Sequence, residues 1–205
     1  EIEPDTLALA RESAPQAGGP AGERTLAELL LLVGARDPIA GLRMMDRIGL
    51  FESVLPEIGR LHEVVQGPNH HLDVYGHTME VVEGILRIES DLERFTGDRA
   101  AEVSEYLAMP LAEGATRGTA LRLGALFHDC AKPQTRSEAD GFISFRGHDR
   151  RGAEQIEERF RALRASRKLT GYLRDLARHH LILGFMVTQM PLDRRQVFAY
   201  LDRTD

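Results

Sequence analysis

Apolar residues recur every three or four positions along most of the chain, and the strict alternation typical of half-buried strands is nearly absent. This spacing places the apolar residues on one face of a helix. The pattern therefore predicts an all-α fold in which helices stack on helices. The predicted helices cover residues 6–13, 23–33, 37–48, 74–88, 98–108, 118–130, 148–163, 169–181 and 193–203.

Glycine, proline and capping residues predict where several of these helices begin and end. The run Ala17-Gly18-Gly19-Pro20 is typical of a linker. Asp37-Pro38 predicts a capped helix start with proline in the first turn, and Gly49 predicts the end of that helix. Asp140-Gly141 followed by Phe142 to Phe145 predicts a turn and the only extended piece of the chain.

A second break, Gln66-Gly67-Pro68-Asn69, divides the chain into two parts of different character. Three or four short helices are expected over residues 23–65, and seven of the eight histidines follow the break, between residues 70 and 180. We therefore expect a helical segment over residues 1–65 and a helical bundle over residues 66–205.

Composition and charge exclude several classes of protein. The 205 residues are 42% hydrophobic and 28% charged, as in globular proteins, and no apolar run approaches the roughly 18 to 20 residues of a membrane span. The single cysteine, Cys130, cannot form an internal disulfide, which favours a reducing compartment, and we expect the cytoplasm. The net charge of −6 argues against a broad nucleic-acid footprint but allows a local basic surface. The chain starts without Met and without a signal-type segment, which indicates a processed start or a fragment.

The first candidate for chemistry is the doublet His128-Asp129, which ends the apolar run from Leu121 to Phe127. Burying this pair without partners would cost several kcal/mol, and a divalent metal ion would compensate that cost. Imidazole and carboxylate are both suitable ligands for such an ion. Taken alone, the doublet is better explained by His128 capping the helix C-terminus and Asp129 starting a turn.

The doublet does not stand alone. His77 lies on the apolar side of an earlier predicted helix, His148 opens a later one, and His179-His180 closes another. Four helix faces or ends therefore offer imidazoles. Cations that can neutralise a phosphate lie nearby in sequence, at Lys132, Arg146, Arg150 and Arg151. This order of residues favours a metal-dependent phosphohydrolase.

These motifs carry a resemblance to a known family. His77, His128-Asp129 with Ala131-Lys132-Pro133, and Gly147 to Ala153 resemble the HD superfamily of metal-dependent phosphohydrolases. Within it, His70 to Thr78 and Lys132-Pro133 are similar to the C-terminal region of tRNA nucleotidyltransferases of the CCA-adding and poly(A) polymerase type. The earlier part resembles the neck and body helices of those enzymes through the segments 23–29, 45–50 and 55–58.

The resemblance implies roles for individual residues. A divalent ion (Mn, Ni, Co, Fe or Mg) would be held by His77, His128 and Asp129 and would supply a nucleophile from water. His148 and His180, or His179 in its place, are implied as ligands of a second ion or as direct phosphate contacts. Asp129 would orient the attacking water, and Lys132 would neutralise charge on the phosphoryl oxygens. Further phosphate contacts are expected from Arg150, Arg151 and His179.

The chain departs from the family pattern in three places. The nucleotidyl-transfer head carries an Asp-x-Asp pair, and no such pair occurs here, so the resemblance covers the part without that head. The HD pattern ends with a further Asp, which is expected in a helix after the segment 197–204. The HD region is therefore expected to be truncated, and Asp202 and Asp205 are the candidates to replace that Asp. Cys130-Ala131 replaces an aliphatic residue and glycine, and Cys130 is expected to be a packing residue.

Three functions remain open from the sequence. The first is a neck, body and HD region of a tRNA nucleotidyltransferase that hydrolyses 2′,3′-cyclic phosphates, 2′-phosphates or other phosphoesters of nucleotides and RNA ends. The second is an independent HD phosphohydrolase of free nucleotides, and the third is a non-catalytic module for RNA binding or dimerisation. The expected partners are tRNA or RNA 3′ ends and nucleotides, with a homodimer as a further expectation and no membrane. His62, His70 and His71 are expected at the surface or in packing.

Overall fold

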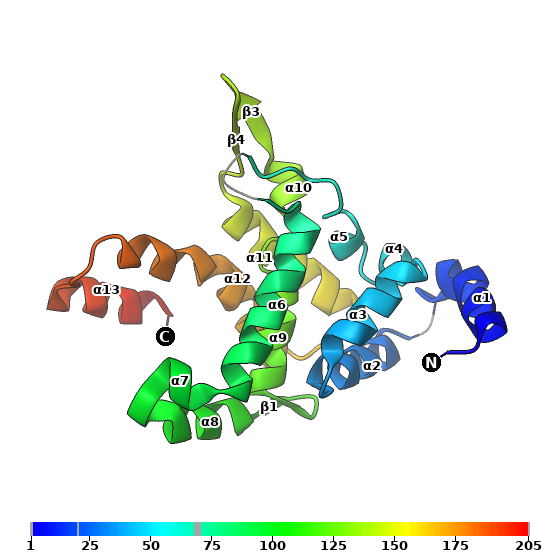
Figure 1. Ribbon diagram of the computed structural model, residues 1–205, viewed down its shortest axis with the longest axis horizontal. Helices are drawn as coiled ribbons and strands as arrows, with labels where there is room; N and C mark the ends of the chain where they lie inside the picture. The colour runs from blue at the N-terminus through cyan, green and yellow to red at the C-terminus, as the bar shows by residue number, and fades with distance from the viewer. Residues whose placement is uncertain (1, 20, 68–70, 205) are drawn as a thin grey trace.

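The computed structural model describes residues 2–19, 21–67 and 71–204 and consists mainly of helices (Figure 1). The predicted all-α class is confirmed. Two 3₁₀ turns, η1 (Ala14–Gln16) and η2 (Gly97–Arg99), precede or follow short helices. The α-helices are α1 (Pro4–Ser13), α2 (Gly22–Gly34), α3 (Pro38–Arg47), α4 (Leu50–Val54), α5 (Pro56–Gly59), α6 (Val74–Ser90), α7 (Leu92–Thr96), α8 (Ala100–Ala108), α9 (Arg117–Phe127), α10 (Lys132–Thr135), α11 (His148–Ala162), α12 (Arg167–Val187) and α13 (Arg194–Thr204).

Two small antiparallel hairpins interrupt the helices. Strands β1 (Pro110–Ala112) and β2 (Ala115–Thr116) pair, as do β3 (Ser137–Ala139) and β4 (Phe142–Ser144). The predicted turn between β3 and β4 is confirmed, with positive φ at Asp140 and Gly141. The prediction that residues 142–145 are the only extended piece is wrong. Strands of two or three residues are too short to leave a periodic pattern in the sequence.

The capping residues fix the helix boundaries as the sequence predicts at several points. The Asp37 carboxylate accepts a hydrogen bond from the Ala40 amide at the start of α3, and α3 ends at Arg47, just before Gly49. The short helices α7 and α10 were not predicted. Helix α12 continues to Val187, beyond the predicted end at residue 181. Among the described helices, none combines the length and the apolar composition needed to cross a membrane.

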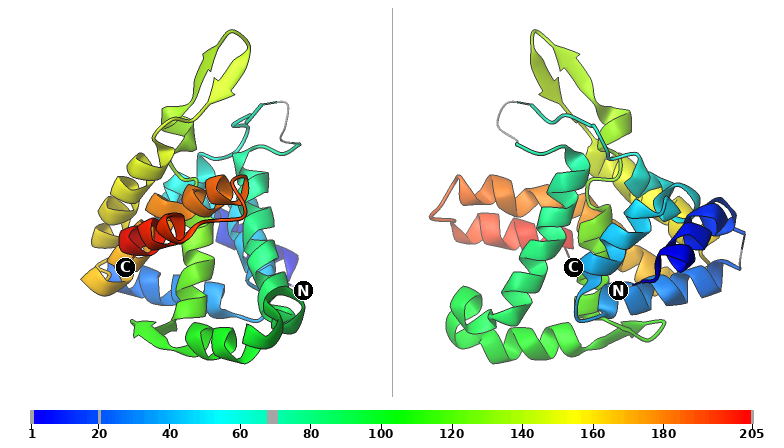
Figure 2. Two further views of the ribbon diagram at one scale, coloured as in Figure 1. Left: turned by 90° about the vertical axis from the view of Figure 1, so that its left-hand side faces the viewer. Right: turned by 45° about the vertical axis from the view of Figure 1, so that its right-hand side comes forward.

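Helix α9 forms the centre of the molecule. Seven of its 11 residues are buried, as expected for a helix surrounded by others. It packs against α2, α6, α8 and α12 (Figure 2). At Gly124, an added Cβ would lie 2.5 Å from Leu176 Cδ1, so a larger residue would require the Leu176 side chain of α12 to move. The last residue of α9, Phe127, is fully buried, and the chain after it therefore starts in the interior.

One hydrophobic core joins the helices before residue 65 to those after it. One partly buried ion pair and one hydrogen bond from a second ion-paired arginine reinforce this contact. The Arg159 guanidinium of α11 donates to both carboxylate oxygens of Glu57 in α5, at 2.9 to 3.0 Å. Arg122 of α9 pairs with Glu89 of α6 and also donates to the Val33 carbonyl at the end of α2, at 3.1 Å. The two parts therefore pack as neighbours in one fold.

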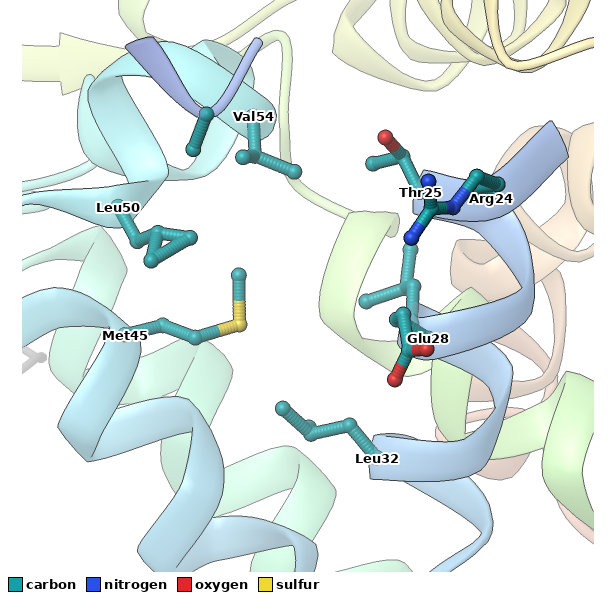
Figure 3. Close-up of a pocket in the computed structure, with 9 residues that line it drawn as sticks. Arg24, Thr25, Glu28, Leu32, Met45, Leu50 and Val54 are labelled. Atoms are coloured by element: carbon teal, nitrogen blue, oxygen red, sulfur yellow. The ribbon is translucent and has the colours of Figure 1, made fainter. Parts of the chain in front are cut away.

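The N-terminal helices leave a pocket of about 340 Å³ between α2 on one side and α3 and α4 on the other. Figure 3 shows Leu32 extending from α2 toward Met45 and Leu50 across the gap, with Glu28 and Arg24 higher on the α2 wall. The pocket is mainly apolar, so the packing of this segment is less complete than that of the core around α9.

Candidate metal centre

Four imidazoles surround the carboxylate of Asp129. The Nε2 atoms of His128 and His77 lie 3.0 and 3.6 Å from Asp129 Oδ2. The Nε2 atoms of His148 and His180 lie 3.2 and 3.6 Å from Asp129 Oδ1. The Asp129 side chain is only 2% exposed, so the centre of this cluster is buried below the protein surface.

Four separate elements bring these side chains together. His77 lies in the first turn of α6, which begins at Asp73 because that carboxylate accepts a hydrogen bond from the Gly76 amide at 2.7 Å. His128 and Asp129 directly follow the buried end of α9. His180 lies on α12, held close to α9 by the contact at Gly124.

His148 enters the cluster through a backbone turn. The preceding residue, Gly147, has φ +80°, a left-handed conformation that a residue with a Cβ adopts only at a cost. This turn starts α11 at His148 and buries the ring. A side chain at position 147 would therefore be expected to displace His148.

The hydrogen bonds of three rings fix which nitrogen faces the cluster. The Nδ1 atoms of His128, His148 and His180 each lie 2.7 Å from a backbone carbonyl, that of Ala125, Phe145 and Ala177 respectively. A carbonyl oxygen can only accept, so each Nδ1 carries the proton. In the neutral ring the lone pair is then on Nε2, which is the atom directed at Asp129. Ligating histidines are held in this way in metal sites.

The electrostatics keep the carboxylate ionised. Burial alone would raise the pKa of Asp129, but the surrounding imidazoles, His128 first, hold that pKa well below its usual range. Burial likewise favours neutral His148, yet its contacts with Asp129 and with the Phe145 carbonyl raise the pKa of this ring. A buried anion is therefore surrounded by groups that become its positive partners when protonated.

The donor set fits a divalent cation. Two groups of side chains bring their ligand atoms within 4.8 Å of one another: His77 with His128 and Asp129, and Asp129 with His148 and His180. Asp129 is common to both, with one oxygen facing each group. Its Oδ1 is buried without a hydrogen-bond partner among the described residues, and an unsatisfied carboxylate oxygen next to two Nε2 atoms is what an ion would satisfy.

The structure adds two residues that sequence reasoning missed, and both contact Lys132. The Lys132 ammonium lies 2.7 Å from Asp129 Oδ2 and donates to the side-chain oxygen of Gln66 at 2.6 Å. It also lies over the ring of Phe145, 5.3 Å from its centroid. Gln66 in turn donates to the Asp73 carbonyl at 3.4 Å, next to the start of α6. No spacing rule links Gln66, in the loop before α6, to a lysine 66 residues later at the start of α10, so the sequence carries no signal for this contact.

Several residues proposed from the sequence lie outside the cluster. His180, and not His179, joins Asp129. Arg150 and Arg151 are exposed on the first turn of α11, and Arg151 pairs with Glu154 at 2.7 Å. Asp202 is exposed on α13 and belongs to neither ligand group, whereas Asp205 lies outside the described residues.

The other expected packing and surface residues can be placed as well. His62 stacks on Tyr75 and bonds to Asp46 at 2.8 Å. His71 is exposed near Glu80, and His70 lies outside the described residues. Cys130 is buried, and burial raises the pKa of its thiol, so it packs as a neutral side chain.

Comparison with known proteins places both parts of the chain. The HD domain profile matches residues 74–205, and the profile described as the probable RNA and SrmB-binding site of polymerase A matches residues 1–61. The chain is 30% identical over 209 residues to the A-adding tRNA nucleotidyltransferase of Deinococcus radiodurans, which covers 98% of this chain and 41% of that protein. It is 31% identical over 166 residues to the CC-adding tRNA nucleotidyltransferase of Thermus thermophilus, covering 79% of this chain and 32% of that protein.

A third relative is the multifunctional CCA protein of Verminephrobacter eiseniae, 26% identical over the whole of this chain and 43% of that protein. The chain thus spans about two fifths or less of the length of these curated relatives. Both profiles and the relatives agree with the resemblance seen in the histidine motifs and in the helices before them. The chain belongs to the HD domain family, and its residues 1–61 are similar to the probable RNA-binding site of polymerase A.

Proposed function

We propose that this protein is a metal-dependent phosphohydrolase that acts on phosphoesters of RNA ends or nucleotides. One observation carries the proposal: imidazoles from four different elements direct Nε2 atoms at the single buried carboxylate of Asp129. A purely structural role would not need four rings around one acid. The assignment of residues 1–65 to a neck and body segment and of residues 66–205 to the HD domain is part of the same proposal.

A divalent ion held by His77, His128 and Asp129, with His148 and His180 for a second ion, would lower the pKa of water and neutralise phosphoryl charge. The protein's own groups complete the site. Asp129 would orient the attacking water. Lys132, held between Asp129 and Gln66, supplies a fixed positive charge for the phosphoryl oxygens. The mixed His and Asp set accommodates Mn, Ni, Co, Fe or Mg.

For a 2′,3′-cyclic phosphate the proposed reaction is balanced by one water molecule. A bond forms between the water oxygen and phosphorus, and one of the two ribose–oxygen bonds to phosphorus breaks. The proton of water passes to the departing ribose oxygen. The product is a 2′- or 3′-phosphate, and no oxidant or reductant takes part.

The RNA partner is proposed from the N-terminal region and from the relatives. Residues 1–61 match a profile described as a probable RNA-binding site, and the similar proteins are named as tRNA nucleotidyltransferases. We therefore propose tRNA or RNA 3′ ends as substrates, with the cytoplasm and a homodimer as expectations. Nucleotide addition is not proposed for this chain alone, since it lacks an Asp-x-Asp pair.

Two other functions compete with this proposal. A non-catalytic RNA-binding or dimerisation module is favoured by the position of Asp202, which does not complete the ligand set. An independent hydrolase of free nucleotides is disfavoured by the RNA-binding profile at residues 1–61.

The test is hydrolysis of a 2′,3′-cyclic nucleotide by the purified chain after loading with each of the five metals. We expect metal-dependent turnover that Asp129→Asn abolishes and that Asp98→Asn, an exposed carboxylate in η2, leaves unchanged. Absence of both bound metal and turnover would favour the non-catalytic module. If tRNA competed no better than free nucleotides at matched salt, the independent nucleotidase would be favoured, because phosphate contacts dominate RNA affinity.

A further inference from the structure

A large groove runs along α12 and reaches the histidine cluster. It has a volume of about 790 Å³ and is lined by residues of α8, β1, α9, α12 and α13. Lys168 lies in the wall toward the start of α12, and His180, a member of the cluster, lies in the wall further along the same helix. At a rise of about 1.5 Å per residue, these two positions are roughly 18 Å apart. The groove is therefore much longer than one nucleotide.

Aromatic side chains are concentrated in this groove. The chain has four tyrosines and no tryptophan, and three of the tyrosines, Tyr106, Tyr172 and Tyr200, line the groove. They come from three different helices, so only the fold brings them together. The Arg117 guanidinium covers the Tyr106 ring at 4.5 Å from its centroid and donates to its hydroxyl at 2.7 Å. A tyrosine ring and a guanidinium plane both offer stacking surfaces for a nucleobase.

Positive groups accompany these rings. Arg117 and Lys168, which are both charged at neutral pH, line the groove. The Arg117 Nε–H is buried and has no hydrogen-bond acceptor among the described residues. The one acid in the wall, Asp175, is paired with Arg174 at 3.0 Å. The local charge is therefore positive although the chain as a whole is acidic.

We propose that this groove binds the terminal nucleotides of a single RNA strand and leads the terminal phosphate to the cluster at His180. Rings for base stacking combined with cations for the backbone are the usual means of holding single strands. A length of roughly 18 Å accommodates several stacked bases at about 3.4 Å each, which favours a strand over a free nucleotide. The proposal rests on the proposed function for the identity of the reacting group, but strand binding itself does not require hydrolysis.

The test measures binding of a short, fluorescently labelled RNA with a 3′-phosphate, by anisotropy, in EDTA and at fixed salt. Tyr172→Leu removes the ring, and Tyr172→Phe is the matched control that keeps it. We expect Tyr172→Leu to weaken binding about tenfold, equivalent to about 1.4 kcal/mol, and Tyr172→Phe to stay within about twofold of the wild type. Equal affinity of the Leu and Phe variants would overturn the proposal.

Lys168→Gln gives a second test that does not depend on packing, because Lys168 is exposed. We expect weaker binding and a salt slope reduced by about one, the signature of one lost phosphate contact. Arg36→Gln removes an exposed cation in the loop after α2 and should change neither quantity. If Lys168→Gln and Arg36→Gln behaved alike, Lys168 would not contact the strand and the groove assignment would fail. Melting curves of all variants show whether Tyr172→Leu remains folded, and Lys168→Gln decides the matter if it does not.

Two comparisons separate this inference from the proposed hydrolysis. A nucleoside 3′-monophosphate that displaced the RNA as well as an unlabelled strand does would show a nucleotide site and overturn strand binding. In one outcome the protein hydrolyses a small non-nucleotide phosphoester, but substitutions at Tyr172 and Lys168 do not change RNA binding. This outcome would support the proposed hydrolysis and contradict RNA binding in the groove. In the converse outcome RNA binding requires both residues, but no metal-dependent turnover is detected. This outcome would support RNA binding in the groove and contradict the proposed hydrolysis.

Discussion

The Nε2 atoms of His148 and His180 lie 3.2 Å apart, and the Nδ1 atom of each ring lies 2.7 Å from its own backbone carbonyl. The carbonyls hold a proton on each Nδ1, so two neutral rings present facing lone pairs. That arrangement is unfavourable unless a proton or a cation lies between the two atoms. Both rings also face Oδ1 of Asp129, so an ion placed there would meet three ligand atoms at once.

The first prediction separates two adjacent histidines. His180→Ala should weaken binding of the divalent ion at least about tenfold, because its Nε2 belongs to the ligand group around Asp129. His179→Ala should leave metal affinity nearly unchanged, because His179 lines the groove and lies outside both ligand groups. Isothermal titration of each variant with Mn²⁺ and Ni²⁺ measures the difference. Equal losses in the two variants would contradict the assignment.

A second prediction concerns Gln66. Gln66→Leu removes one of the two acceptors of the buried Lys132 ammonium and leaves only Asp129, which should slow turnover about tenfold and destabilise the fold by about 1 to 3 kcal/mol. Metal affinity should change little, because Gln66 offers no atom to either ligand group. Gln66→Glu keeps an acceptor for Lys132 and should restore most of the turnover.

The measurements for Gln66 are kcat, KM and metal affinity of the three proteins. A loss in kcat with unchanged metal affinity supports a positioning role for Gln66. If Gln66→Glu were as slow as Gln66→Leu although both remained folded, the contact with Lys132 would not matter for turnover.

The third prediction tests the ion pair between α5 and α11. Replacing Glu57 by Gln or Arg159 by Met should each lower the free energy of unfolding by about 2 kcal/mol, since the partner is left partly buried without its counter-charge. The double variant should lose less than the sum of the two, with a coupling of about 1 kcal/mol or more. Urea unfolding measures all four proteins.

The exposed pair Arg99–Glu102 provides the control for that cycle. Its side chains are 67% and 66% exposed, so no measurable coupling is expected. Unfolding of the wild type should also occur in one transition, because a single core spans both parts of the chain. Two transitions, or a coupling for Glu57–Arg159 no larger than that of the exposed pair, would contradict this interpretation.

The fourth prediction concerns alkaline pH. Burial, together with the neighbouring Tyr106, raises the pKa of Tyr172 above its usual value, and the positive charge of Arg117 opposes this only in part. Above about pH 10 the unfolded chain releases this proton while the folded protein retains it. The stabilising contribution is therefore complete below pH 10 and is lost as the pH rises toward the higher folded pKa.

Tyr172→Phe removes this contribution to the pH dependence. Its free energy of unfolding should decline less steeply than that of the wild type between about pH 9.5 and 11. Near neutral pH the free energies of the two proteins should change in parallel with pH. Urea unfolding across this range provides the comparison. Parallel curves throughout would show that Tyr172 ionises equally in both states.

Local sequence was sufficient for much of the helical framework. Asp37 begins α3 and Asp73 begins α6, because a carboxylate next to the first free amides stabilises a helix start wherever it occurs. The errors fall where local signals are weak. Hairpin β1–β2 and the short helix α10 contain too few residues for a period, and α12 continues to Val187 through residues that are mostly exposed.

For the candidate site, too, part of the description follows from the sequence and part only from the tertiary structure. The residue types and the order of His77, His128-Asp129, His148 and His179-His180 are properties of the sequence, and they were enough for the family resemblance. The choice between His179 and His180 was not available, because adjacent residues on a helix point about 100° apart and only the packing of α12 against α9 selects one.

The sequence by itself determined the helical class, the main helix starts and the set of ionisable side chains, since these follow from spacing, capping and residue chemistry over a few neighbouring positions. Only the tertiary structure decided that Gln66 contacts Lys132 and that three tyrosines line one groove that includes His180. Those contacts join residues tens of positions apart. Their geometry depends on how whole helices pack against α9, and no local pattern encodes it.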